Sequence, residues 1–332
     1  MATEARLWQA YSNDFPIGAA VNPAVIKSHR ELITQHFNSI TAENEMKPCN
    51  LQPLEGQFDF TTADRMAAFA KQNNMKMRGH TLVWHAQTPD WFFTDGQGGA
   101  ASRDTLLGRM KEHISTVAGH FKGSTYCWDV VNEAIDDHGD GQFLRKSPWL
   151  EIIGPDFMQK AFTFAHEADP GAQLFYNDYN ETDPVKCAKI CRLVRQLKEQ
   201  GVPIHGLGLQ GHWNIFSPTL DEIRTALDQH AALGVKLQIT ELDVSIYASS
   251  DKSTEPATPL EALLEKQAQY YESIFRLFRE YREHICGVTF WGVADDATWL
   301  KFFPVMGRKN YPLLFDEDHQ AKEAFQRIMK LG

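Results

Sequence analysis

Apolar and polar positions follow a repeating order along this chain. Short apolar runs with strand-like alternation are each followed by a longer segment with apolar positions at helical spacing. The pattern predicts eight strands, at 15–21, 39–41, 75–83, 126–131, 174–176, 205–209, 235–241 and 286–290. It predicts helices between them at 24–37, 63–72, 103–121, 157–168, 185–200, 220–233 and 260–281.

Strands that alternate with helices of this length favour parallel pairing through helical crossovers. Eight strands in one chain of this length indicate a closed (β/α)8 barrel, the TIM-barrel class of α/β folds. An open doubly wound sheet is the alternative, but no Gly-x-Gly-x-x-Gly follows any predicted strand. We see no linker or internal repeat, so residues 1–332 are predicted to form a single domain.

Composition narrows the possible partners. The chain has 332 residues and a formal net charge of −10, and no basic run or stripe is visible. We therefore expect no nucleic-acid partner and no binding to anionic membranes. Met1–Leu7 lacks the charged-then-apolar pattern of a secretory signal. With five cysteines and no Cys-x-x-Cys pair, the sequence predicts a cytoplasmic protein without a metal or other cofactor, and a monomer by default.

Polar and aromatic residues gather where the predicted strands end, which is the face on which such barrels carry active sites. Amides, carboxylates and indoles together suit a sugar, because hydroxyl groups need directional partners and the faces of a pyranose ring pack on aromatic planes. In chain order these residues are Glu43, Asn44, Lys47, His80, Trp84, Gln87, Asn132, Glu133, Asn177, Tyr179, Gln210, His212, Glu241, Asp243, Trp291 and Trp299.

Two of these residues, Glu133 and Glu241, end the fourth and seventh predicted strands. A pair of carboxylates at the mouth of a rigid barrel favours glycoside hydrolysis, with one general acid and one nucleophile or base. His212 and Asp243 would favour a charged Glu241. The apolar Val130-Val131 before Glu133 would favour its protonated form. We therefore assign Glu133 as acid/base and Glu241 as nucleophile, although taken alone Glu241 and Asp243 could be two solvated acids.

Three other functions compete with this hypothesis. A metal-dependent hydrolase could use His80, His85 and His212, but no His-x-His or His-Glu-x-x-His pattern appears. A Schiff-base aldolase could use Lys47, and an inactive barrel could bind sugar without cleaving it. The sequence also leaves inverting chemistry open, because the outcome depends on the distance between the carboxyl groups.

For several residues a structural interpretation is favoured over a functional one, and for His85 the two are equally weighted. Asp129 lies inside a strand and is predicted to be a buried, paired acid. His85 could make a structural hydrogen bond or contact substrate. Gly206 and Gly208 are predicted to give space inside the barrel. Trp128 and Trp149 are expected in the core or the barrel wall, and Cys187 and Cys191 as buried small side chains on one helix.

Taken together, the strand-end motifs resemble glycoside hydrolase family 10, the retaining endo-β-1,4-xylanases. The resemblance runs in order from about residue 15 to residue 316. It is carried by Thr41–Lys47, Gly79–His85, Asp129–Ala134, Asn177–Asn180, Gly208–His212 and Ile239–Asp243.

The resemblance implies a double-displacement mechanism on xylan or xylo-oligosaccharides. It implies that His212 and Asp243 hold the nucleophile and that Tyr179 contacts the leaving-group sugar. Because no secretory signal or carbohydrate-binding module is visible, short imported xylo-oligosaccharides are expected to be better substrates than polymeric xylan. The resemblance also implies that the glycone subsites are lined by Glu43, Asn44, Lys47, His80, Trp84, Gln87, Asn132, Gln210, Trp291 and Trp299.

Overall fold

A computed structural model of the chain describes residues 6–137 and 141–332. Most of Met1–Leu7, on which the prediction of a missing secretory signal depends, lies outside the described residues. The strands are β1 (Ile17–Val21), β2 (Ser39–Ala42), β3 (Lys76–Trp84), β4 (Thr125–Asn132), β5 (Gln173–Asp178), β6 (Gly206–Leu209), β7 (His212–Asn214), β8 (Lys236–Ser245) and β9 (Ile285–Phe290).

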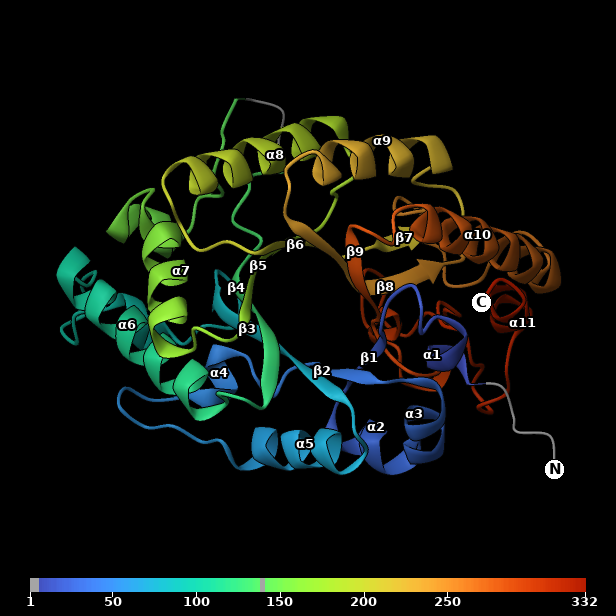
Figure 1. The fold of residues 1–332 in the computed structure, drawn as a ribbon, viewed down its shortest axis with the longest axis horizontal. Coiled ribbons are helices and arrows are strands. Elements are labelled where there is room, and N and C mark those ends of the chain that lie inside the picture. The colour runs from blue at the N-terminus through green and yellow to red at the C-terminus, as the bar shows by residue number, and fades with distance from the viewer. Residues whose placement is uncertain (1–5, 138–140) are drawn as a thin grey trace.

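Eight of these strands form a closed parallel barrel. Hydrogen-bonded neighbours run from β1 through β2, β3, β4, β5 and β6, and β6 then pairs with β8. The ring closes because β8 pairs with β9 and β9 pairs with β1. The short β7 pairs with β8 outside this ring. The predicted (β/α)8 barrel is confirmed, with β7 as an unpredicted addition (Figure 1).

The helices surround the ring of strands (Figure 1). They are α1 (Leu7–Ala10), α2 (Pro23–Ser28), α3 (Arg30–His36), α4 (Pro48–Leu51), α5 (Thr61–Gln72), α6 (Arg103–His120), α7 (Phe157–Ala168), α8 (Pro184–Glu199), α9 (Leu220–Ala231), α10 (Leu260–Glu280) and α11 (Glu323–Met329). Short 3-10 turns cover Asp90–Phe93, Asp295–Ala297 and Trp299–Lys301, and a π-helical turn covers Trp149–Ile153. In the described part of the chain, no helix is both long and apolar enough to cross a bilayer.

The prediction of one helix over 24–37 is wrong, because the chain bends at His29 and forms α2 and α3. The His29 backbone leaves helical geometry with φ −110° and ψ 20°. Its Nε2 lies 2.8 Å from Asp296 Oδ1 and its Nδ1 lies 2.7 Å from Ser28 Oγ. The partner Asp296 is far away in sequence, so helical periodicity could not predict the break.

The helices pack on the barrel through apolar stripes at helical spacing. In α10, Tyr271, Phe275 and Phe278 recur at four- and three-residue intervals and are all completely buried. Phe275 stacks on Phe290 of β9 with ring centroids 6.0 Å apart. Burial of such large side chains stabilises each helix by roughly 1.5–3 kcal/mol per residue.

The barrel interior contains a buried ion pair below the cleft. Arg78 of β3 donates two hydrogen bonds to the carboxylate of Asp129 on β4, and both residues are completely buried. Arg78 Nε also donates to Gln238 Oε1 of β8 at 2.8 Å. Asp129 is therefore the buried, paired acid that its position in a strand predicts. Arg78 links three strands of the barrel, because it contacts Asp129 on β4 and Gln238 on β8 from its own position on β3.

Candidate active site

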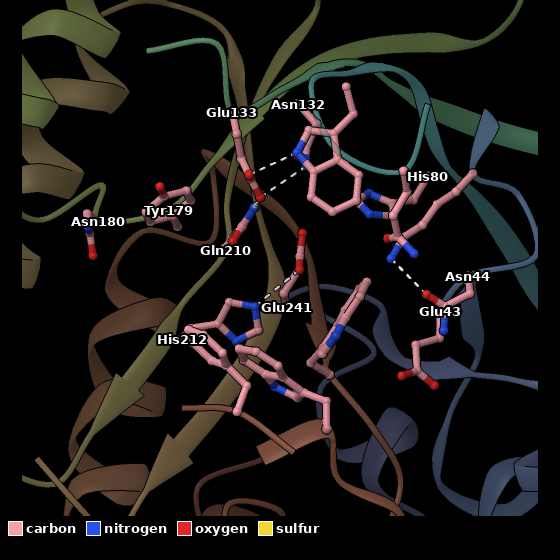
Figure 2. A pocket seen from close by; sticks show the side chains of 16 residues that line it. Glu43, Asn44, His80, Asn132, Glu133, Tyr179, Asn180, Gln210, His212 and Glu241 are labelled. Carbon is pink, nitrogen blue, oxygen red and sulfur yellow. Dashed lines mark hydrogen bonds and ion pairs between the residues drawn. The ribbon is translucent and has the colours of Figure 1, made fainter. Parts of the chain in front are cut away.

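A cavity of about 590 Å³ opens where the barrel strands end (Figure 2). Its size falls within the range of typical ligand sites. Both glutamates and all twelve residues predicted to bind substrate line it, and Asp243 contacts two of them, His212 and Trp299, from behind. The lining residues are Glu43, Asn44, Lys47, His80, Trp84, Gln87, Asn132, Glu133, Tyr179, Asn180, Gln210, His212, Glu241, Trp291, Trp299 and Phe303.

Glu241 lies deep in this cavity, on β8, and only 5% of it is exposed. Asn177 Nδ2 donates a hydrogen bond of 2.8 Å to Glu241 Oε1. His212 Nε2 lies 3.2 Å from Glu241 Oε2, and His212 Nδ1 lies 3.0 Å from Asp243 Oδ2. Trp299 Nε1 donates to the same oxygen of Asp243 at 2.7 Å. The chain therefore surrounds the Glu241 carboxylate with donors and a cation.

These contacts keep Glu241 and His212 charged. Burial alone would raise the pKa of Glu241, but the hydrogen bond from His212, the charges of His80 and His212 and the hydrogen bond from Asn177 lower it to about 2. Burial alone would lower the pKa of His212, but the charges and hydrogen bonds of Asp243 and Glu241 raise it to about 10. At neutral pH the pair is an ionised carboxylate beside an imidazolium.

Glu133 follows β4 and lies closer to solvent than Glu241, with an intermediate exposure. Its backbone is left-handed, with φ 57°, a strained conformation for this residue type that the surrounding structure must stabilise. Asn177 supports it, because its carbonyl oxygen accepts a hydrogen bond of 2.9 Å from the Glu133 N–H.

The surroundings of the Glu133 carboxyl group are polar rather than apolar. Glu133 Oε2 accepts from Trp84 Nε1 at 2.9 Å, and Oε1 accepts from Gln210 Nε2 at 2.9 Å and Asn132 Nδ2 at 3.2 Å. The expectation of an apolar environment from Val130-Val131 is therefore wrong. Val130 and Val131 are buried in β4, whereas the left-handed turn takes Glu133 out of the strand.

Two asparagines join the glutamates through hydrogen bonds. Asn177 Nδ2 donates to Asn132 Oδ1 at 2.8 Å as well as to Glu241, and Asn132 Nδ2 donates to Glu133. Thr240 Oγ1 donates to Asn177 Oδ1 at 2.7 Å and so fixes the orientation of this amide. The two carboxylates are thus held relative to each other by the ends of β4 and β5.

Figure 2 shows His80, Asn44 and Glu43 on one side of the two glutamates and Tyr179 and Asn180 on the other. The cleft therefore extends past the carboxylates in both directions. A chain of sugars could occupy it with the bond to be cleaved beside the carboxylates.

The side toward β2 and β3 offers fixed polar groups. Lys47 is buried, and its Nζ donates to Asn44 Oδ1 at 2.9 Å and lies 5.1 Å from the centre of the Trp84 ring. Glu43 Oε2 accepts from Asn22 Nδ2 at 2.9 Å. Burial lowers the pKa of Lys47 while the charge of Glu241 raises it, and the net shift is downward. Lys47 is not an ordinary solvated lysine.

His80 is oriented by the buried ion pair beneath it. Its Nδ1 lies 2.8 Å from Asp129 Oδ2, so the Nε2 end of the ring is left for the cavity. Asp129 in turn is held by Arg78. The ring of Trp291 meets His80 edge-on, with centroids 5.5 Å apart. Packing and charge together leave His80 little freedom at the cavity wall.

The opposite side of the cleft is built around Tyr179. Its hydroxyl donates to Asp137 and accepts from Arg145 Nη2 at 2.6 Å. Lys186 Nζ lies 4.2 Å from the centre of the Tyr179 ring. The hydroxyl is thus fixed by charged neighbours.

Two lining residues, Asn180 and Phe303, were not among the predicted site residues. Phe303 is 60% exposed and stacks on Trp299, with centroids 5.5 Å apart and an interplanar angle of 11°. Its position four residues after Trp299, next to Phe302, is a sequence signal that could have identified it. Asn180 has a left-handed backbone with φ 52°, which asparagine tolerates better than most residues. It lies at the end of the Asn177–Asn180 motif.

The three histidines of the metal hypothesis do not form a metal site. His85 does not line the cavity but a smaller pocket beside it. Among the residues that the structure describes, the groups that could hold a metal ion are Cys187, Cys191 and His230, and His29, Asp296 and His319. Neither group contains His80, His85 or His212.

Comparison with known proteins identifies relatives over nearly the whole chain. The model of glycosyl hydrolase family 10 matches residues 6–331. An endo-1,4-beta-xylanase of Geobacillus stearothermophilus is 54% identical over 98% of this chain and 98% of its own length. An endo-1,4-beta-xylanase B of Paenibacillus barcinonensis is 52% identical over 99% of both chains.

Solved structures agree with this match. Xylanase XynB from Paenibacillus barcinonensis, solved in complex with a conduramine derivative, superposes with a TM-score of 0.96 at 52% identity and 99% coverage of both chains. A GH10 xylanase from Thermobacillus composti superposes with a TM-score of 0.90 at 53% identity. The superposition covers 99% of this chain and 100% of the Thermobacillus composti chain.

Proposed function

This chain belongs to glycosyl hydrolase family 10, and we propose that it hydrolyses internal β-1,4 bonds of xylan with Glu133 and Glu241 as its catalytic carboxylates. The family consists of retaining enzymes. The observation that carries the assignment is the pairing of two carboxylates in one cleft with opposite surroundings, one buried beside an imidazolium and one close to solvent.

Each carboxylate suits one role in double displacement. In the first step Glu241 attacks the anomeric carbon while Glu133 gives a proton to the departing sugar oxygen. In the second step Glu133 removes a proton from water, which attacks the anomeric carbon and releases Glu241.

The nucleophile must be ionised, and His212, Asn177 and Asp243 favour that state of Glu241. Glu133 must exchange its proton between steps, and its intermediate exposure allows that exchange. When Glu133 is ionised in the second step, the N–H groups of Trp84, Gln210 and Asn132 stabilise its charge.

The remaining residues of the cleft bind the sugar chain. Trp291, Trp299 and Phe303 offer ring faces and edges, while Asn44, Lys47 and His80 offer polar groups to the hydroxyls on one side. Tyr179 and Asn180 lie on the other side, where we propose that the leaving-group sugar binds.

Matched alanine variants test the two roles on aryl xylosides that differ only in the leaving group. Glu241→Ala is expected to reduce turnover of every substrate to background, because no nucleophile remains. Glu133→Ala is expected to lose roughly 10²–10⁴-fold on poor leaving groups, which need a proton. With a good leaving group its first step should persist, visible as a burst of phenolate.

Asn180→Ala is a suitable control, because Asn180 lines the same cleft while other side chains make the hydrogen bonds to the two glutamates. Asn180→Ala should change the turnover of substrates with good and poor leaving groups by the same factor. Loss of activity on good and poor leaving groups to the same extent in Glu133→Ala, as expected only for Glu241→Ala, would contradict the division of roles.

A further inference from the structure

Three buried side chains on the outside of the barrel form a cluster that hydrolysis does not use. Cys187 and Cys191 lie four residues apart on α8, so their side chains share one face of the helix. His230 on α9 meets them there. The cysteines are each 1% exposed and the histidine is completely buried. None of the three lines the substrate cavity.

Their ligand atoms lie close enough together to share one metal ion. One ligand atom from each residue can be chosen so that all lie within 4.8 Å of one another. Cys191 Sγ lies 3.5 Å from His230 Nδ1, and Cys187 Sγ lies 3.7 Å from Nε2. A tetrahedral zinc ion with ordinary bond lengths separates a sulfur from a nitrogen ligand by about 3.6 Å, which the Cys191–Nδ1 distance matches. Cys187 Sγ lies beside the other ring nitrogen and would have to rotate toward an ion bound at Nδ1.

The surroundings orient His230 as those of a metal ligand do. Its Nε2 lies 3.3 Å from the backbone oxygen of Glu181. If Nε2–H donates there, Nδ1 keeps its lone pair and faces Cys191. Metal-binding histidines commonly donate their second N–H to a carbonyl or carboxylate in this way. Two thiolates and a neutral imidazole would also cancel the charge of a divalent cation, which suits a buried site.

A surface hollow leads to the cluster. A cavity of about 240 Å³ is lined by Cys187, Gln229, Thr182, Thr225, Asp221 and Glu222, among others. The two acids favour the approach of a cation. Gln229 Oε1 lies 3.5 Å from Cys187 Sγ, so this amide or a water in the hollow could complete four ligands.

We propose that Cys187, Cys191 and His230 bind a thiophilic divalent cation of the zinc type, which joins α8 to α9. Sulfur and imidazole ligands select such an ion over magnesium or calcium. The ion is structural, because its ligands lie outside the substrate cleft. Binding should raise the melting temperature, since a preformed site exists only in the folded chain.

Cadmium titration of the reduced, metal-stripped protein tests the proposal. Cadmium bound to thiolates gives an ultraviolet charge-transfer band, and we expect the band to saturate at one ion per chain. Zinc should abolish the band by displacement, and a chromophoric chelator should then report zinc affinity. The double variant Cys187→Ser, Cys191→Ser should lose the band.

Two controls separate this site from others. Cys286→Ser changes a half-buried cysteine on β9 outside the cluster, so it should keep the band. His319→Gln alters the group of His29, Asp296 and His319, which has no sulfur and should not affect the band. The metal-stripped protein should hydrolyse xylan at the same rate as the untreated protein. This activity serves as the control that the chain remains folded.

Absence of a thiolate band in the wild-type protein at saturating cadmium would overturn the proposal, whatever the variants do. A band that survives in the double serine variant would overturn it as well. In either case Cys187 and Cys191 would be buried thiols that only make weak hydrogen bonds to His230.

Discussion

At Glu241, a carboxyl group with 5% exposure keeps its charge because His212 and Asn177 contact one oxygen each. Glu133 has the same side chain, but its left-handed backbone places it nearer to solvent, among three N–H donors. The roles proposed for the two residues therefore depend on their neighbours. His212 matters most among these neighbours, and its own charge depends on Asp243.

Replacing Asp243 with asparagine should reduce the reactivity of Glu241 indirectly, through His212. Asp243→Asn removes the charge that raises the pKa of His212, so His212 should lose its proton at lower pH than in the wild type. A hydrogen bond to a charged group contributes about 1.5–3 kcal/mol, so kcat/KM should fall roughly 10- to 100-fold at neutral pH.

Thermal unfolding across pH provides an independent readout of the same variant. A pKa raised from 6.5 to about 10 in the folded state adds stability that is fully present below pH 6.5 and is lost as pH rises toward 10. Asp243→Asn should therefore unfold at a lower temperature than the wild type near pH 7, and the gap should narrow toward pH 10. A gap that stays constant over this range would contradict the account.

At the scale of strands, polar side chains at the ends of β3 to β6 position the two glutamates. The link from Asn177 on β5 to Glu241 on β8 passes over β6, and β6 has glycine at the crossing point. A Cβ atom added to Gly208 would lie 2.2 Å from Asn177 Oδ1 and 3.0 Å from Thr240 Cγ2. Gly208 therefore makes the space that the sequence predicts, and that space is occupied by the active-site asparagine.

Gly208→Ala should consequently damage activity through Asn177. We expect a loss of kcat of at least roughly tenfold, because Asn177 must move away from Glu241 and its hydrogen bond to a charged group is lost. Gly108→Ala in α6 is the matched control, since nothing lies within 4 Å of the added atom. It should keep full activity and gain about 0.5–1 kcal/mol of stability. Equal activity of the two variants would show that Asn177 is not needed.

The ion pair that connects β3 and β4 makes a different prediction, on stability. Asp129→Asn leaves Arg78 buried without its counter-charge, which typically costs about 3–5 kcal/mol. The urea midpoint should fall accordingly. Asp156→Asn breaks the exposed pair with Arg103 and should cost no more than about 1 kcal/mol. Similar midpoints for the two variants would contradict a structural role for Asp129.

The sequence predicts these elements to different extents. The eight barrel strands could be predicted because each contains a short segment rich in apolar residues and bounded by polar or helix-forming segments. The three-residue β7 is too short for a pattern. The bend at His29 depends on Asp296, and the cysteine cluster depends on His230 of another helix. Contacts between residues far apart in sequence leave no trace in local periodicity.

At the scale of the whole molecule, a closed barrel brings strand ends from every part of the chain to one face, so the site residues could be predicted together. All the predicted substrate-binding residues line one cavity for this reason. Phe303 was missed because it belongs to the loop after Trp299 rather than to a strand end. It extends the aromatic wall of the cleft toward solvent.

The position of Phe303 predicts an effect that depends on substrate length. Phe303→Ala should lower kcat/KM more for longer xylo-oligosaccharides than for short ones, because only longer chains reach the rim. An aromatic contact is worth about 0.5–1.5 kcal/mol beyond area burial, so the loss on long chains should be roughly two- to tenfold. Phe216 is an exposed phenylalanine that does not line the cleft, so Phe216→Ala should leave kcat/KM unchanged for both long and short substrates.

The most direct test of the central claim is the configuration of the sugar azide formed when azide replaces the missing carboxylate. With an activated aryl β-xyloside, azide should attack the anomeric carbon in Glu241→Ala from the face that the nucleophile left, release the phenolate and give the α-azide. In Glu133→Ala, azide should attack the sugar bound covalently to Glu241 and give the β-azide. Proton NMR distinguishes the two products. The opposite assignment of products, or the same product from both variants, would contradict the proposed roles of Glu133 and Glu241.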